Sequence, residues 1–323
     1  MCTSISFKTK AHYFGRNLDM ECSFDEKVII VGRNFPFGFR HLEPMFSHFA
    51  IMGIGIVEEN FPLYYEAVNE KGLAVSGLRF TSSVYNDINV DKENLCVFEL
   101  IPYVLGKCSN VNEAKELLTD INIVNTEFSE GLGTAQLHWM ISDKDSSITV
   151  ECVQEGLKIY YNPAKVLTNN PEFPMQVFNL NNYMSLTADE PVSKFSDEFE
   201  FNAYSRGMGA LGLPGDMSSV SRFVKATFVL HNSVCGKSED ESISQFFHIL
   251  SSVSQQKGCV KVGDLYEKTV YSSCYNTDDG ILYYTTYNNS QISAVTLHKE
   301  NLDRSDLIIY NLNKEQNICF QNK

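Results

Sequence analysis

The sequence has few of the features that mark metal, membrane or nucleic-acid proteins. Its nine cysteines are scattered, and no two of them have the CxxC spacing of a zinc site. No run approaches the roughly 18 uncharged apolar residues of a transmembrane helix. Lys and Arg total 26 against 40 Asp and Glu, which gives a net charge of −14. That acidity, with no basic cluster, argues against nucleic-acid binding.

Two further features indicate where the protein works. The chain begins without a basic region followed by an apolar stretch, so we expect no secretory signal. An odd number of unpatterned cysteines is typical of free thiols in a reducing compartment, which predicts a cytoplasmic protein. Hydrophobic residues make up 43% of the chain, with 22 Phe and 16 Tyr, enough for a sizeable core. We expect one domain over residues 1–323.

The hydrophobic pattern predicts strands, helices and strands again rather than alternating βαβ units. The expected strands cover residues 2–7, 13–18, 28–32, 50–57, 73–76, 136–142, 148–153, 157–161, 166–168, 280–287, 291–297 and 307–310. The expected helices cover residues 95–105, 112–118, 219–231 and 241–251, with Ser109 and Asn110 as caps between the first two. This order indicates an α+β protein with antiparallel sheets and helices packed outside them.

Cys2 is the most informative position. A small residue after the initiator methionine permits removal of Met1, which leaves a thiol and a free α-amine on one residue. Their reference pKa values, about 8.5 and about 7.7–8.0, make the pair a complete nucleophile and base near neutral pH. An ordinary cysteine that happens to fall at position 2 is the alternative.

Arg16 and Asp19 form the second candidate element. A hairpin of the first two expected strands brings them back beside residue 2, where Arg16 favours a thiolate and Asp19 orients the α-amine. The alternative is an exposed ion pair at a strand end, which contributes little. Simple alternation puts the two side chains on opposite faces, so this interpretation needs the strand to bend or end there.

At this point the chain resembles the choloylglycine hydrolases, N-terminal-nucleophile hydrolases that include bile salt hydrolases and penicillin V acylases. The resemblance rests on short motifs in a shared order along nearly the whole chain. After Cys2 these are GRNLDM at 15–20, NEKGL at 69–73, LHWMI at 137–141, VLTN at 166–169, GLPGD at 212–216, SRF at 221–223 and YTTY at 284–287.

The resemblance implies a four-layer αββα fold, with two antiparallel sheets between helices, and a homotetramer. It implies Cys2 as the nucleophile with Arg16 and Asp19 as polar partners. It also implies Asn169 as an oxyanion-hole amide and Arg222 as a buried arginine bracing the site. From local sequence alone, Asn169 reads as a turn former at a strand end and Arg222 as a helix-surface cation.

Other residues near these motifs have simpler explanations. His138 reads as a core or sheet residue, because this chemistry needs no imidazole, and Trp139 reads as packing.

At Arg79 the sequence departs from the family, which places an asparagine or a tyrosine there. The family uses the backbone N–H of that position as the second oxyanion donor, which any non-proline residue supplies. The Arg79 side chain would face the leaving group, or else solvent or Asp87.

The family chemistry is acyl transfer through a Cys2 thioester, with no metal or organic cofactor. The implied substrate is a conjugated bile salt, a small-molecule amide that yields a free bile acid and glycine or taurine. Loop residues expected to line an apolar cleft are Met20, Phe24, Phe61, Tyr65, Phe128 and Leu132, with core packing as the alternative for each. Two other functions stay open: an acylase for penicillin V or N-acyl homoserine lactones, and a silent relative that retains Met1 and binds steroid or lipid.

Overall fold

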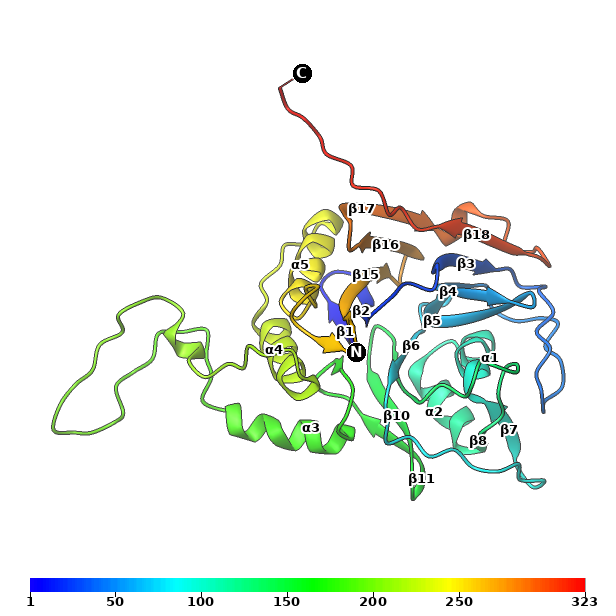
Figure 1. Cartoon of the computed structure of the whole chain (residues 1–323), viewed down its shortest axis with the longest axis horizontal. Helices are drawn as coiled ribbons and strands as arrows, with labels where there is room; N and C mark the ends of the chain where they lie inside the picture. The colour runs from blue at the N-terminus through cyan, green and yellow to red at the C-terminus, as the bar shows by residue number, and fades with distance from the viewer. Residues whose placement is uncertain (323) are drawn as a thin grey trace.

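A computed structural model describes residues 1–322 and places two large antiparallel sheets at the centre of the molecule (Figure 1). The first sheet has six strands. In spatial order they are β12 (Val166–Leu167), β1 (Cys2–Lys8), β2 (His12–Met20), β15 (Lys268–Asn276), β16 (Ile281–Thr286) and β17 (Asn289–Thr296). The second sheet has eight. They are β11 (Gly156–Tyr161), β10 (Ser147–Val153), β9 (Leu137–Ser142), β6 (Ala74–Arg79), β5 (Phe61–Asn69), β4 (Ile51–Glu58), β3 (Lys27–Val31) and β18 (Leu307–Asn311).

Helices cover the outer faces of both sheets, as Figure 1 shows. α4 (Ser219–Asn232) and α5 (Glu239–Ser251) pack on the first sheet, and α1 (Leu100–Lys107) and α2 (Val111–Thr119) on the second. A short α3 (Phe173–Asn179) follows β12. Two small ribbons complete the fold: β7 (Glu93–Cys96) with β8 (Ile121–Val124), and β13 (Lys261–Val262) with β14 (Leu265–Tyr266). The four-layer αββα prediction is confirmed.

Two hydrophobic clusters match these layers. The larger lies between the sheets and continues under α4 and α5, with Phe14, Met52 and Phe246 completely buried. The other lies between the second sheet and α1 and α2, and includes Trp139 and Val104. Because inner strands of the second sheet such as β3, β9 and β10 bury both faces, their residues read as apolar runs rather than as an alternating pattern.

Local sequence explains where the helices begin. Ser218 accepts a hydrogen bond from the Ser221 N–H at the start of α4, and Ser238 with Glu241 forms a capping box at α5. Asn110 caps α2, as expected. Ser109 instead bonds the side chain of Glu113 and does not cap the helix.

Three expectations about the elements are wrong. The helix expected over residues 95–105 begins later, because Glu93–Cys96 forms β7 and a 3₁₀ turn precedes α1. β5, which contains Phe61 and Tyr65, is a strand rather than the loop expected there. β15 was not expected at all, although it pairs with β2 at the centre of the first sheet.

Candidate active site

Cys2 is the first residue of β1, in the interior of the first sheet, with 5% of its surface exposed. β1 and β2 pair so that Cys2 lies opposite Leu18 and Ser4 opposite Arg16. Paired residues share a face, and Ser4 Oγ lies 2.7 Å from Ser76 Oγ of the second sheet. Cys2 and Arg16 therefore share the face of β1 and β2 that is turned toward the second sheet.

Gly15 explains part of the GRNLDM motif. A Cβ atom at this position would lie 2.0 Å from the Ser273 carbonyl oxygen of β15. No side chain fits there, so glycine allows β15 to approach β2 closely. That approach brings the residues of β15 beside the end of β2 that carries Arg16 and Asp19.

Arg16 is held between the two sheets with 1% of its surface exposed. Its Nη1 donates to the carbonyls of Gly77, at 2.6 Å, and Tyr65, at 3.1 Å, and lies 3.7 Å from Glu66 Oε2. Burial acts to lower the pKa of Arg16, but the neighbouring charges of Cys2 and Glu66 outweigh it and raise that pKa. The guanidinium is a permanent cation next to the thiol and not the exposed strand-end ion pair.

Asp19 lies on the opposite face of β2, toward the helices, and is completely buried. Its Oδ1 accepts a 2.6 Å hydrogen bond from the Thr269 hydroxyl, and its Oδ2 lies 4.0 Å from Arg222 Nη1. Burial raises the pKa of the Asp19 carboxyl, while Arg222 and Thr269 act in the opposite direction. β2 neither bends nor ends before Asp19, so that requirement of the sequence interpretation is wrong.

Asn169 connects the start of β1 with Arg222 and with the end of β6. Its Oδ1 accepts hydrogen bonds from the Cys2 backbone N–H at 2.9 Å and from Arg222 Nη2 at 2.7 Å. Because two donors fix Oδ1, the amide orientation is determined, and Nδ2 donates to the Arg79 carbonyl at 2.8 Å. An amide nitrogen carries two hydrogens, so Nδ2 can donate one further hydrogen bond.

Arg222 reaches the site from near the N-terminal end of α4. It is 1% exposed, so its interpretation as a helix-surface cation is wrong. Its Nη1 donates to the Cys2 carbonyl and, at 2.6 Å, to Thr3 Oγ1, and its Nε donates to the Met217 carbonyl at 3.0 Å. Arg222 thus ties α4 to the first two residues of β1.

Met1 extends the β1 ladder by one residue. The Asp19 N–H donates to the Met1 carbonyl at 2.9 Å, and the Met1 ammonium donates to the Asp19 carbonyl at 2.6 Å. The ammonium also forms an ion pair with Glu267, which is buried. With Met1 in place, the Cys2 nitrogen is a peptide N–H. Glu267, just before β15, and Thr269, on β15, carry no local sequence signal of their own, and the strand pattern did not predict β15.

The six apolar candidates do not form one group. Phe61 and Phe128 are buried in the cluster beneath α1, with ring centroids 6.0 Å apart, so core packing describes them. Met20 and Tyr65 are half-buried, on β2 and β5 rather than in loops, and both pack against the inter-sheet cluster. Phe24 and Leu132 are 52% and 40% exposed.

Arg79, at the end of β6, is exposed and forms no ion pair with Asp87 or any other residue within 1–322.

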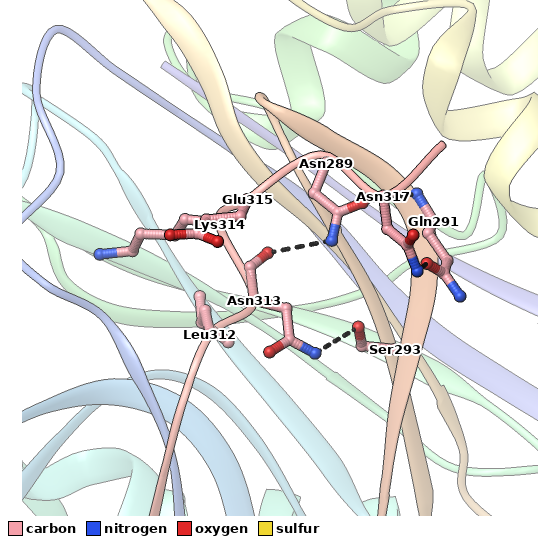
Figure 2. Close-up of a pocket in the computed structure, with 8 residues that line it drawn as sticks. All are labelled: Asn289, Gln291, Ser293, Leu312, Asn313, Lys314, Glu315 and Asn317. Atoms are coloured by element: carbon pink, nitrogen blue, oxygen red, sulfur yellow. Dashed lines mark hydrogen bonds between the residues drawn. The ribbon is translucent and has the colours of Figure 1, made fainter. Parts of the chain in front are cut away.

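A polar hollow at the surface lies away from Cys2. This cavity of about 540 Å³ separates β17 from the C-terminal segment, and Figure 2 shows the side chains around it. Its lining is polar apart from Leu312, and Asn313 donates from its amide to Ser293 Oγ at 2.9 Å. None of the predicted site residues lines it.

Within residues 1–322, no three His, Cys, Asp or Glu side chains are placed to hold a metal. No helix of the same residues is long and apolar enough to cross a bilayer.

Comparison with known proteins identifies the group to which this arrangement belongs. The family model of linear amide C–N hydrolases, choloylglycine hydrolase family, matches residues 2–310. The chain belongs to the choloylglycine hydrolase family. It is therefore an amidase of the linear amide C–N hydrolase type.

Several relatives are similar over nearly their full length. The chain is 51% identical to a bile salt hydrolase/transferase of Lactiplantibacillus plantarum, covering 98% of each chain. It is 37% identical to a bile salt hydrolase/transferase of Clostridium perfringens, over 98% of this chain and 99% of the relative. The crystal structure of the C2A mutant of the Clostridium perfringens conjugated bile acid hydrolase superposes with a TM-score of 0.92, at 37% identity and 100% coverage of both chains. A penicillin V acylase from Agrobacterium tumefaciens shares the fold, with a TM-score of 0.74 at 20% identity, over 96% of this chain and 90% of that one.

Proposed function

We propose that this amidase hydrolyses the amide bond of conjugated bile salts and releases free bile acid with glycine or taurine. The observation that carries the proposal is the hydrogen bond from the Cys2 nitrogen to Asn169 Oδ1, in a site that also holds buried Arg16 and Arg222. The substrate class is supported by relatives named as bile salt or conjugated bile acid hydrolases, at 51%, 37% and 35% identity.

The nucleophile in this proposal is Cys2 after removal of Met1. Removal converts the Cys2 nitrogen from a peptide N–H into an α-amine at the same place, 2.9 Å from Asn169 Oδ1. Arg16 places a cation on the same face of the sheet as the Cys2 side chain. The amine and the thiol then lie on one residue, so the base needs no separate side chain.

Acyl transfer follows in two steps. The thiolate attacks the amide carbonyl carbon, and the oxyanion receives hydrogen bonds from Asn169 Nδ2 and from the backbone N–H of Arg79. The α-ammonium of Cys2 gives its proton to the leaving nitrogen as the C–N bond breaks. Water activated by the same amine then hydrolyses the thioester. Arg222 orients the start of β1 through its hydrogen bond to the Cys2 carbonyl, and Asp19 lies 4.0 Å from that guanidinium.

A second candidate function concerns the acyl acceptor. Three relatives, at 51%, 37% and 31% identity, are named hydrolase/transferase. A thioester accepts an amine as readily as water when the amine reaches it in its neutral form. Transfer of the bile acyl group to a free amino acid is therefore a branch of the same mechanism, and it predicts new conjugates when amino acids are added.

Two other functions compete with bile salt hydrolysis. An acylase for penicillin V or another N-acyl amide would use the same nucleophile, and a relative named penicillin V acylase is 29% identical over 52% of this chain. A silent binder would keep Met1, whose ammonium would then stay paired with Glu267. Incubation with glycine- and taurine-conjugated bile salts, penicillin V and N-acyl homoserine lactones, with amine release followed by mass spectrometry, separates the three. Release of glycine or taurine is expected, and release from penicillin V alone would contradict the proposal.

We further propose a homo-oligomer, a tetramer by family resemblance. A long segment between α3 and α4 extends away from the sheets (Figure 1). It carries Phe195, Phe199 and Phe201, which are 80%, 49% and 57% exposed and whose ring centroids are 5.2–6.1 Å apart. Such an exposed aromatic group is typical of a surface covered by another subunit. Light scattering should give four chains, and Phe195→Ser with Phe199→Ser should lower that number.

The compartment proposed from the cysteines is the reducing cytoplasm. All nine cysteines are free, including Cys22, Cys259 and Cys319 at the surface. Oxidising compartments favour paired cysteines, so exposed free thiols fit a reducing one. Fractionation of the producing cell should place the activity with the cytoplasmic proteins.

A further inference from the structure

A completely buried histidine, His138 of β9, lies behind the two elements that carry the proposed oxyanion donors. Its Nδ1 is 2.9 Å from Glu151 Oε1 on β10, and its Nε2 is 2.9 Å from the Thr168 carbonyl oxygen. Its ring stacks on that of Phe80, with centroids 4.6 Å apart and planes 4° from parallel. The proposed reaction assigns none of these groups a task.

Hydrogen bonds hold both nitrogens of the His138 ring. A carbonyl oxygen only accepts, so Nε2 donates to Thr168. Nδ1 shares a proton with Glu151 Oε1, and Glu151 also receives the Phe173 N–H at 3.1 Å and 3.2 Å on its two oxygens. Glu151 is the titratable group among the residues that bond to or stack on this ring within residues 1–322.

The same contacts connect His138 to both sides of the oxyanion site. Thr168 precedes Asn169, and Phe80 follows Arg79. The Asn169 amide in turn donates to the Arg79 carbonyl at 2.8 Å. One ring therefore sets the position of the backbone next to the Asn169 side chain and next to the N–H of residue 79.

We propose that His138, paired with Glu151, is a positioning residue that holds both oxyanion donors at the spacing the transition state requires. The inference rests on the proposed acyl transfer. Misplacement of preorganised donors weakens transition-state binding more than substrate binding. Loss of the His138 hydrogen bonds therefore lowers kcat and leaves KM and the nucleophile unchanged.

Two variants that differ at one residue test this. Glu151→Gln keeps the hydrogen bonds of the ring: its amide donates to Nδ1, its oxygen accepts from Phe173, and Nε2 still donates to Thr168. The double variant Glu151→Gln with His138→Phe keeps a ring on Phe80 but loses both histidine hydrogen bonds, and it leaves no buried charge unpaired. Glu151→Gln should keep kcat within about threefold of the wild type, and the double variant should lose about tenfold or more.

Three controls make the result specific. KM for a glycine-conjugated bile salt and the alkylation rate of Cys2 by iodoacetamide should stay within about twofold in both variants, because neither depends on the oxyanion donors. Near-ultraviolet circular dichroism checks the fold. Equal kcat in the two variants, or an equal loss in hydrolysis and alkylation, would overturn the inference. A wild type that alkylates at Cys2 but cleaves no amide would instead overturn the proposed function.

A second pair of variants tests the Thr168 side if the double variant does not fold. His138→Gln keeps one donor toward Thr168 and should retain a higher kcat than His138→Ala. Equal kcat in these two variants would overturn the inference.

Discussion

Arg16 and Asp19 lie three residues apart on one strand, on opposite faces, and both are buried. Arg16 reaches Gly77 in the second sheet, while Asp19 reaches Thr269 and lies near Arg222 on the helix side. A regular strand therefore supplies a cation to one side of Cys2 and a carboxylate to the other. Their separation also keeps the two charges from neutralising each other.

Asn169→Ala removes one oxyanion donor, so kcat should fall by about 10²–10³ with a smaller change in KM. Asn169→Asp is the matched variant, because it keeps an oxygen for the Cys2 nitrogen and for Arg222 but replaces the donor with an acceptor. A similar loss in both variants assigns the effect to Nδ2. A rise in KM alone would make Asn169 a binding residue. Steady-state kinetics on a conjugated bile salt gives both constants.

Arg222→Met should destabilise the fold. Arg222 is buried 4.0 Å from Asp19 Oδ2, and its removal takes the guanidinium away from that buried carboxylate. Breaking a buried pair costs about 3–5 kcal/mol of unfolding free energy, which urea titration measures. Adding Asp19→Asn should recover part of the loss. The exposed Arg206→Met is the control, and an equally small effect at Arg222 would contradict the buried pairing.

Arg79→Ala should raise KM for both glycine and taurine conjugates by about tenfold. The chain has a net charge of −14, both leaving groups are anions, and Arg79 is an exposed cation beside the proposed oxyanion site. Added salt should reduce the effect, because exposed charges are screened. Arg79→Asn should recover much of the loss by restoring the family residue.

A neutral bile-acid amide of similar size is the control for Arg79. It should be nearly indifferent to Arg79→Ala, because it carries no charge for the guanidinium to attract. Equal sensitivity of neutral and anionic substrates would show that Arg79 acts on the fold or points to solvent.

Glu66 should make stability depend on pH. Burial raises its pKa from 4.5 to about 7, although Arg16 and Tyr271 act in the opposite direction. A raised carboxyl pKa favours the protonated folded state, so the contribution is complete below pH 4.5 and is lost as pH rises through about 7. Glu66→Gln should remove this loss, up to about 3 kcal/mol, in urea unfolding between those pH values. The exposed Glu130→Gln should keep the wild-type slope, and an unchanged slope in Glu66→Gln would refute the assignment.

The motifs in the sequence predicted the layers and the residues around Cys2, but local patterns could not predict β15. That strand contains half-buried Ser272 and buried Ser273, whose hydroxyls bond to Asn17 Oδ1 and to the Arg16 N–H. Buried hydrogen-bonded serines remove the apolar signal by which strands are recognised. The same reasoning applies to β5, where Glu66 is completely buried in mid-strand.

Long-range contacts explain the other errors. Arg222 lies on α4 and contacts the Cys2 carbonyl. Its neighbours along the helix do not predict this contact. Phe61 and Phe128 are far apart in sequence but share a core with α1, so proximity to a motif did not indicate a substrate contact. Such placements follow from the pairing of the sheets, which a single sequence does not encode locally.

The central claim is that the free α-amine and the thiol of Cys2 perform the hydrolysis together. The direct measurement compares chains of verified intact mass: one beginning at Cys2, one retaining Met1, one with an alanine ahead of Cys2, and Cys2→Ser beginning at Ser. Circular dichroism should show the same fold in all four, because only the first residues of β1 differ. Release of glycine or taurine should be confined to the chain that begins at Cys2, with losses of about 100-fold or more in the others. Equal turnover by the chain that retains Met1 would contradict the account.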